Sequence, residues 1–253
     1  MSLAQERGHA GTGTPGHPTS STAQRALAWS AVVSMVGFGI GWVGFAGFLP
    51  LPAPWHGPSE IAGIFLGHSI GIRLGAIFMI IGTMFWVPWA AIVAVQIDDD
   101  SRAGRALRYT QICCATVGTA VVLVAMLMWV VAAFRAERDP ALVQLLSDLG
   151  FVIAIMPFAI FAMWNVALSL AIFCDGDGDG DGDGDRSSAY PRWSAYLGIW
   201  LAVLYVPGAC LAFFQHGAFA WNGLLAFYVP VGAFFVWLVV MTALTLRSIA
   251  RPR

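Results

Sequence analysis

Residues 59–96 read SEIAGIFLGHSIGIRLGAIFMIIGTMFWVPWAAIVAVQ. This stretch decides the fold, because it stays apolar from Glu60 onward until three consecutive aspartates end it. A straight helix of about 37 residues would measure roughly 55 Å, whereas the hydrocarbon core of a bilayer is about 30 Å thick. We therefore expect residues 60–69 to lie in the outer interface of a membrane. The crossing would then begin near Ile72, with Arg73 close to the lipid headgroups.

Glycines recur in this stretch at every fourth position: Gly63, Gly67, Gly71 and Gly75. Small residues at this spacing favour the close approach of a second helix, in this chain or in a partner. A second interpretation is a cleft for a flat apolar ligand, with Glu60, His68 and Arg73 at its mouth. If the cleft exists, a leucine at Gly67 or Gly71 is expected to abolish ligand binding while the protein still inserts.

The composition of the whole chain indicates an integral membrane protein. Of 253 residues, 58% are hydrophobic and 11% are charged, and the mean hydropathy is +0.75. These values lie outside the range of soluble proteins. Six apolar segments are each long enough to cross a bilayer: about 26–49, 70–97, 109–134, 149–173, 194–215 and 221–246. We predict an all-α, six-helix transmembrane domain over residues 26–247, preceded by a disordered cytoplasmic tail over residues 1–25.

The arginines predict the orientation of the chain. All 13 basic residues are arginine, and with the N-terminus placed in the cytoplasm only Arg135 and Arg138 fall in outer loops, apart from Arg73 near the outer interface. This bias predicts a multi-pass protein of the bacterial inner membrane with both termini in the cytoplasm. The net charge of −1 gives no indication of a nucleic-acid partner.

Two connections have distinctive sequences. Residues 134–150, FRAERDPALVQLLSDLG, are amphipathic and predict a short helix on the outer membrane surface. Residues 174–192 form an acidic, low-complexity cytoplasmic loop that contains DGDGDGDGDGD at 175–185. The tract is similar to the first half of an EF-hand loop, but Arg186 stands where a bidentate glutamate is required. Calcium binding by the tract is left open.

Histidines on the outer side are the candidate metal ligands. His56, His68 and His216, with Glu60, could together hold copper, iron or a haem. The alternative is that each imidazole bonds to backbone or headgroups at the interface, and we predict no cofactor. The four cysteines form no recognisable disulfide or zinc pattern.

Polar residues and prolines inside the apolar segments are a second set of candidates. Trp164, Asn165 and Asn222 could bond across helices or contact a ligand. Prolines interrupt four of the crossings, and such breaks kink helices and can open cavities: Pro88, Pro157, Pro207 and Pro230.

Four stretches of the chain carry a resemblance. They are EIAGIFLGHSIGIRLGA at 60–76, RDPALVQLLSDLG at 138–150, YPRWSAYLGIWLAVLYVPG at 190–208 and FAWNGLLAFYVP at 219–230. This pattern resembles an uncharacterised family of six-helix bacterial membrane proteins of the actinobacterial type. The resemblance implies the six-helix fold and no catalytic residues.

Common enzyme motifs such as Gly-x-Ser-x-Gly, HExxH and the Walker loop are not found in the sequence. The first functional hypothesis is therefore a protein that binds, carries or assists with an apolar small molecule (a lipid, sterol or hydrocarbon). A redox or metal-binding enzyme subunit that uses the outer histidines is the second. A structural subunit that binds a partner or a second copy through its glycine faces is the third.

Overall fold

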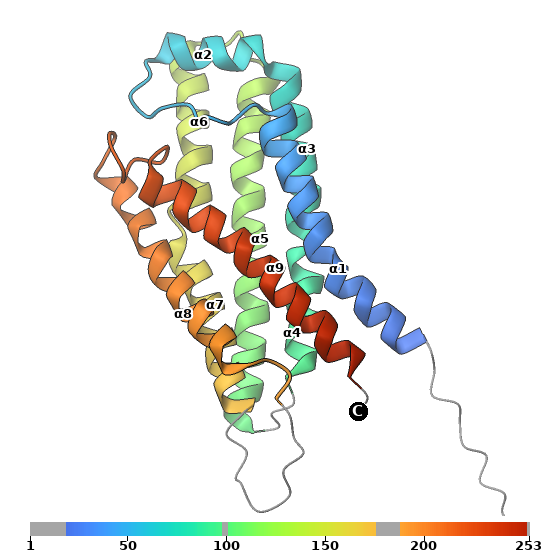
Figure 1. The fold of residues 1–253 in the computed structure, drawn as a ribbon. Helices are drawn as coiled ribbons and strands as arrows, with labels where there is room; N and C mark the ends of the chain where they lie inside the picture. Colours follow the sequence, from blue (N-terminus) through green and yellow to red (C-terminus); the bar gives the residue numbers. More distant parts are fainter. Residues whose placement is uncertain (1–18, 98–100, 176–187, 252–253) are drawn as a thin grey trace, which may run out of the picture.

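The computed structural model describes residues 19–97, 101–175 and 188–251, and these ranges fold as helices without a strand. Six helical spans are long and apolar enough to cross a membrane: Ser21–Phe45, Ser69–Gln96, Arg102–Phe134, Pro140–Asp175, Arg192–Ala212 and Leu224–Ala250. The chain is therefore an all-α, six-helix, multi-pass membrane protein (Figure 1).

Most spans consist of more than one helical element. In chain order the elements are α1 (Thr19–Gly39), the π-helical η1 (Ile40–Phe45), α2 (Pro58–Gly67), α3 (Ser69–Met84), α4 (Trp86–Gln96), α5 (Arg102–Phe134), α6 (Pro140–Ile155), α7 (Phe158–Asp175), α8 (Arg192–Tyr205), the 3₁₀-helical η2 (Val206–Ala212), the π-helical η3 (Leu224–Tyr228) and α9 (Val229–Ala250). Among the six described spans, α5 alone is one uninterrupted α-helix.

The long apolar stretch breaks at His68, so it does not form one long helix that projects beyond the bundle. His68 has φ −128° and ψ 23°, which ends α2 and starts α3. α2 lies across one end of the bundle, whereas α3 runs along the length of the bundle (Figure 1). Ser59 and Glu60, the polar start of the stretch, therefore lie on α2 and outside the span that begins at Ser69.

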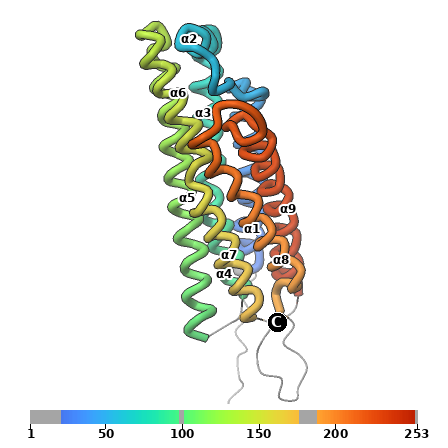
Figure 2. The backbone as a smooth tube through the Cα atoms, turned by 90° about the vertical axis from the view of Figure 1, so that its left-hand side faces the viewer, coloured from blue at the N-terminus to red at the C-terminus, as the bar shows by residue number. Residues whose placement is uncertain are grey.

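Two segments differ from the sequence interpretation. α1 already begins at Thr19, so residues 19–25 are helical rather than part of a disordered tail. Residues 140–155 form α6, which stands upright beside α5 and continues into α7 (Figures 1 and 2). The amphipathic pattern there has another cause: Leu142 and Leu145 face outward, whereas Val143 and Ser147 face the bundle.

The core is rich in aromatic side chains, and its buried polar groups are mostly paired. Trp89, Trp129 and Trp164 are completely buried. The Gln111 amide donates from Nε2 to the Ala90 carbonyl at 2.8 Å and accepts at Oε1 from the Trp164 indole at 3.0 Å. These bonds join α4, α5 and α7 deep inside the bundle, where an unpaired amide would be costly.

Candidate functional site

The glycine ladder is divided between two helices. The break at His68 leaves Gly63 and Gly67 on α2, while Gly71 and Gly75 lie on α3. Gly63 and Gly67 are exposed, and a Cβ at either position would meet no atom within 4 Å. The four glycines therefore do not form one continuous stripe.

The two glycines of α3 pack against the end of the first span. A Cβ at Gly75 would lie 2.5 Å from the Gly41 carbonyl, and one at Gly41 would lie 2.5 Å from the Gly75 carbonyl. A Cβ at Gly71 would lie 2.5 Å from the Phe45 carbonyl and from His68 Nε2. This interface lies inside the chain and has no room for a ligand, so only Gly63 and Gly67 remain available to another chain.

The three histidines expected as candidate metal ligands make separate contacts. His56 Nε2 lies 3.4 Å from a carboxylate oxygen of Glu60. The ring of His68 donates from Nε2 to the Phe45 carbonyl at 2.8 Å. The ring of His216 stacks on the Trp55 indole, with 4.9 Å between the ring centroids. Across residues 19–97, 101–175 and 188–251, no three His, Cys, Asp or Glu side chains are grouped to hold a metal ion.

The remaining candidates are also dispersed. Arg73 donates from Nε to the Ser69 carbonyl one turn earlier, at 3.2 Å. Trp164 and Asn165 are both buried in α7, whereas Asn222 is half-buried in the loop before η3. The Asp-Gly tract beyond Asp175 lies outside the described residues.

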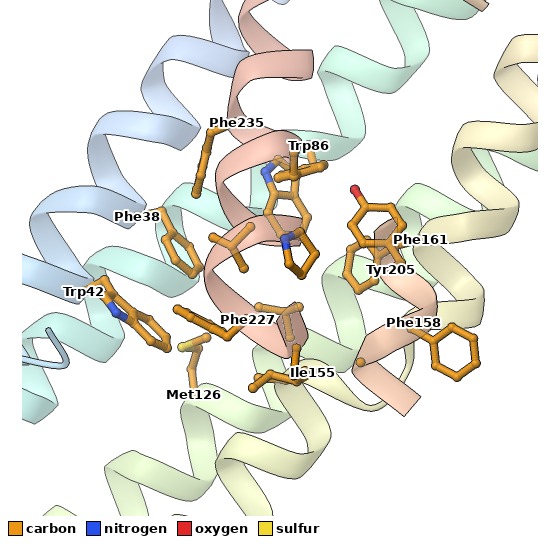
Figure 3. A pocket seen from close by; sticks show the side chains of 17 residues that line it. Phe38, Trp42, Trp86, Met126, Ile155, Phe158, Phe161, Tyr205, Phe227 and Phe235 are labelled. Carbon is orange, nitrogen blue, oxygen red and sulfur yellow. The ribbon is translucent and has the colours of Figure 1, made fainter. Parts of the chain in front are cut away.

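The structure places an apolar cavity of about 110 Å³ elsewhere, in the middle of the bundle. It lies beside Ile155 and Phe158, the two residues that flank the midpoint of the fourth span. Figure 3 shows Phe38, Trp42 and Phe227 on one side and Phe161 and Tyr205 opposite them. The complete lining is Phe38, Trp42, Trp86, Val122, Met126, Ala154, Ile155, Phe158, Phe161, Tyr205, Gly208, Ala226, Phe227, Pro230, Val231, Phe234 and Phe235.

Four prolines lie at or near helix breaks around this cavity. A proline cannot donate a backbone hydrogen bond, and its ring clashes with the carbonyl four residues earlier. Pro157 separates α6 from α7, Pro207 lies where α8 tightens into η2, and Pro230 follows η3 at the start of α9. Pro88 lies three residues beyond the break between α3 and α4 at Phe85. Each break places a neighbouring residue in the cavity wall: Phe158, Gly208, Pro230 itself and Trp86.

Two polar atoms of the cavity residues have no hydrogen-bond partner among the described residues. They are Nε1 of Trp86 and the hydroxyl of Tyr205, whose side chains belong to residues only 4% and 8% exposed. Tyr205 lies near Asn165, whose Oδ1 is also buried without a partner at standard geometry, so the Tyr205 hydroxyl is placed to donate to this oxygen. Trp42, by contrast, donates to the Phe48 carbonyl at 2.9 Å. Unpaired buried polar groups are uncommon in folded proteins and require an explanation.

None of the ligand-binding residues expected from the sequence lines this cavity. Trp164 and Asn165 lie nearest to the cavity. The ring centroid of Trp164 is 6.2 Å from that of Phe234, and Asn165 is next to Tyr205. The prolines were the sequence signal for the cavity, but their position on separate helices gave no indication that the breaks would meet.

Comparison with known proteins identifies no relative: no family model, no curated protein and no solved structure matches this chain. Its function must therefore be argued from its own geometry.

Proposed function

We propose that the protein binds a slender apolar molecule in the cavity at the centre of its helix bundle. The observation that carries this proposal is the meeting of four proline-associated helix breaks around an apolar cavity. Breaking a helix in a membrane is costly unless neighbouring groups compensate. A bundle with no ligand to hold would gain stability from continuous helices and a filled core.

The size of the cavity limits the ligand class. An engineered apolar cavity of about 150 Å³ accepts benzene or xenon. A cavity of about 110 Å³ therefore suits a segment of hydrocarbon chain or a single small ring better than it suits a fused-ring sterol. We favour the hydrocarbon and acyl-chain classes over the sterol class for this reason.

The unpaired atoms suggest a polar feature on the ligand. The Trp86 indole can only donate a hydrogen bond, whereas the Tyr205 hydroxyl can donate or accept. An ester, ketone or alcohol oxygen attached to the apolar ligand would accept from either group. A plain alkane would leave the Trp86 indole unpaired, so we expect an oxygen-bearing chain to bind more tightly than the alkane of equal length.

The experiment that tests this function is photolabelling with a long-chain fatty alcohol that carries a diazirine. The full-length protein in mild detergent is irradiated with the probe, and labelled peptides are located by mass spectrometry. We expect labels on the residues around Ile155, Phe158 and Phe227. Ala154→Leu, which fills the cavity wall, should lower this labelling by about tenfold, because overpacking a filled site costs roughly 1–3 kcal/mol.

Ala159→Leu is the matched control, because Ala159 is exposed on α7 and does not line the cavity. Labelling at the cavity should be unchanged in this variant. Equal cavity labelling in the Ala154→Leu and wild-type proteins would overturn the proposal.

A further inference from the structure

A second cleft, of about 410 Å³, lies at the opposite end of the molecule from α2, where α8 begins and α9 ends (Figure 1). It shares no residue with the central cavity. Its wall combines the segment before α8, the first turn of α8 and the last turns of α9: Ser188, Ala189, Tyr190, Pro191, Arg192, Trp193, Leu244, Arg247 and Arg251.

The wall of the cleft contains three arginines. Arg192, Arg247 and Arg251 all line it, and all three are exposed. Arg251 donates from Nη1 to the Ser188 carbonyl at 3.3 Å, which holds its guanidinium at the edge of the cleft. Within the described part of the chain, Arg247 and Arg251 form no ion pair with a carboxylate.

An acidic segment adjoins the cleft: Asp175 is described, and the five further aspartates of residues 175–185 lie outside the described residues. The carboxylate of Asp175 accepts from the Ala189 backbone N–H at 3.1 Å and is the described acidic group that adjoins this wall. The Tyr190 hydroxyl bonds to Thr245 at 2.9 Å, and burial raises the pKa of Tyr190, so this group stays neutral. Arg247 and Arg251 are therefore the two arginines of this wall on which the binding of an anion depends.

The other side of the cleft is apolar and lies next to the outer surface of the bundle. Leu244 is nearly buried at the floor, and the indole of Trp193 is 53% exposed beside the arginines. Tryptophan is enriched where the hydrocarbon of a membrane meets the headgroups. A soluble anion would use only the arginines, whereas a lipid would also contact the indole and the leucine.

We infer that this cleft binds the phosphate of an anionic phospholipid, with its glycerol and upper acyl chain against Trp193. Guanidinium groups bind phosphate oxygens through paired hydrogen bonds. The start of α8 adds the positive end of a 14-residue helix beside Arg192. Basic clefts between transmembrane helices on the arginine-rich side are where such headgroups are held.

The test compares lipids added to the full-length protein in neutral detergent. Phosphatidylglycerol should raise the thermal unfolding temperature, and phosphatidylcholine at the same concentration should have a much smaller effect. The affinity for phosphatidylglycerol should fall by about fivefold for each arginine removed, so Arg247→Gln with Arg251→Gln should lose about 25-fold. Trp193→Gln should also weaken phosphatidylglycerol binding, although it leaves the charge of the cleft unchanged, because it removes the apolar contact with the lipid.

Arg102→Gln is the matched control, because Arg102 is an exposed arginine at the same end of the bundle but outside the cleft. If the double variant fails to fold, the two single variants provide the same comparison. Unchanged phosphatidylglycerol binding without the arginines would overturn the inference. Equal stabilisation by inorganic phosphate alone would also overturn it, because the ligand would then be a free anion rather than a lipid.

Discussion

At the scale of single residues, the glycines show what spacing can and cannot predict. The four-residue repeat in residues 63–75 predicted a close helix contact, and Gly75 makes one with Gly41. The repeat did not reveal that Gly63 and Gly67 would point into open space, because that depends on the break at His68. The prediction that residues four apart share one face holds only within one continuous helix. A single residue with non-helical dihedral angles ends that helix and changes which face the later residues occupy.

The glycine contact gives a matched pair of substitutions. Gly75→Ala places a methyl group 2.5 Å from the Gly41 carbonyl, so it should destabilise the protein by about 1–3 kcal/mol. Gly67→Ala meets no neighbour and should be neutral or slightly stabilising, because alanine is the better helix former. Thermal unfolding in detergent measures both variants, and equal unfolding temperatures would contradict the packing described here.

At the scale of elements, the prolines were informative, but the amphipathic pattern of residues 134–150 was misleading. A helix at a membrane surface and the end of a crossing helix both present leucines on one face and polar groups on the other. Hydropathy alone cannot distinguish a surface helix from the end of a crossing helix. The packing of α6 against α5 and α2 shows that residues 140–155 belong to the bundle. The proline breaks were predictable because they follow from covalent geometry. Their meeting point depends on tertiary packing and was not predictable.

The break between α6 and α7 supplies an element-scale prediction. Pro157→Ala restores a backbone donor for the carbonyl of Ile153 and should join the two helices into one. Because Ile155 and Phe158 flank this break in the cavity wall, photolabelling of the cavity should fall while helix content rises in circular dichroism. Pro140→Ala is the control, since proline at the first turn of α6 disrupts no hydrogen bond. Unchanged photolabelling of the cavity in Pro157→Ala would show that the break between α6 and α7 does not shape the site.

At the scale of the whole molecule, six spans put both described ends of the chain on the same side. The arginine clusters at the starts of α5 and α8 and the end of α9 lie at that end of the bundle, opposite α2 (Figure 1). Composition and segment lengths were sufficient to predict the six-helix fold, because backbone groups in a bilayer must be satisfied within helices. The candidate site could not be predicted in this way, because it depends on how helix breaks far apart in the sequence meet in three dimensions.

The proposed orientation can be measured in intact bacterial cells. In a variant whose native cysteines are replaced by alanine, Ser59→Cys on α2 should react with a membrane-impermeant maleimide added outside. Arg102→Cys at the start of α5 should react only after the cells are opened. The reverse pattern would place the arginine-rich end outside and contradict the orientation.

The central claim, that the bundle holds a slender apolar molecule, is tested most directly by native mass spectrometry of the full-length protein released from its membrane in mild detergent. We predict a discrete added mass corresponding to an oxygen-bearing hydrocarbon chain, retained in Ala159→Leu and lost in Ala154→Leu. A haem or metal mass in place of such a molecule, or the same added mass in both variants, would contradict the claim.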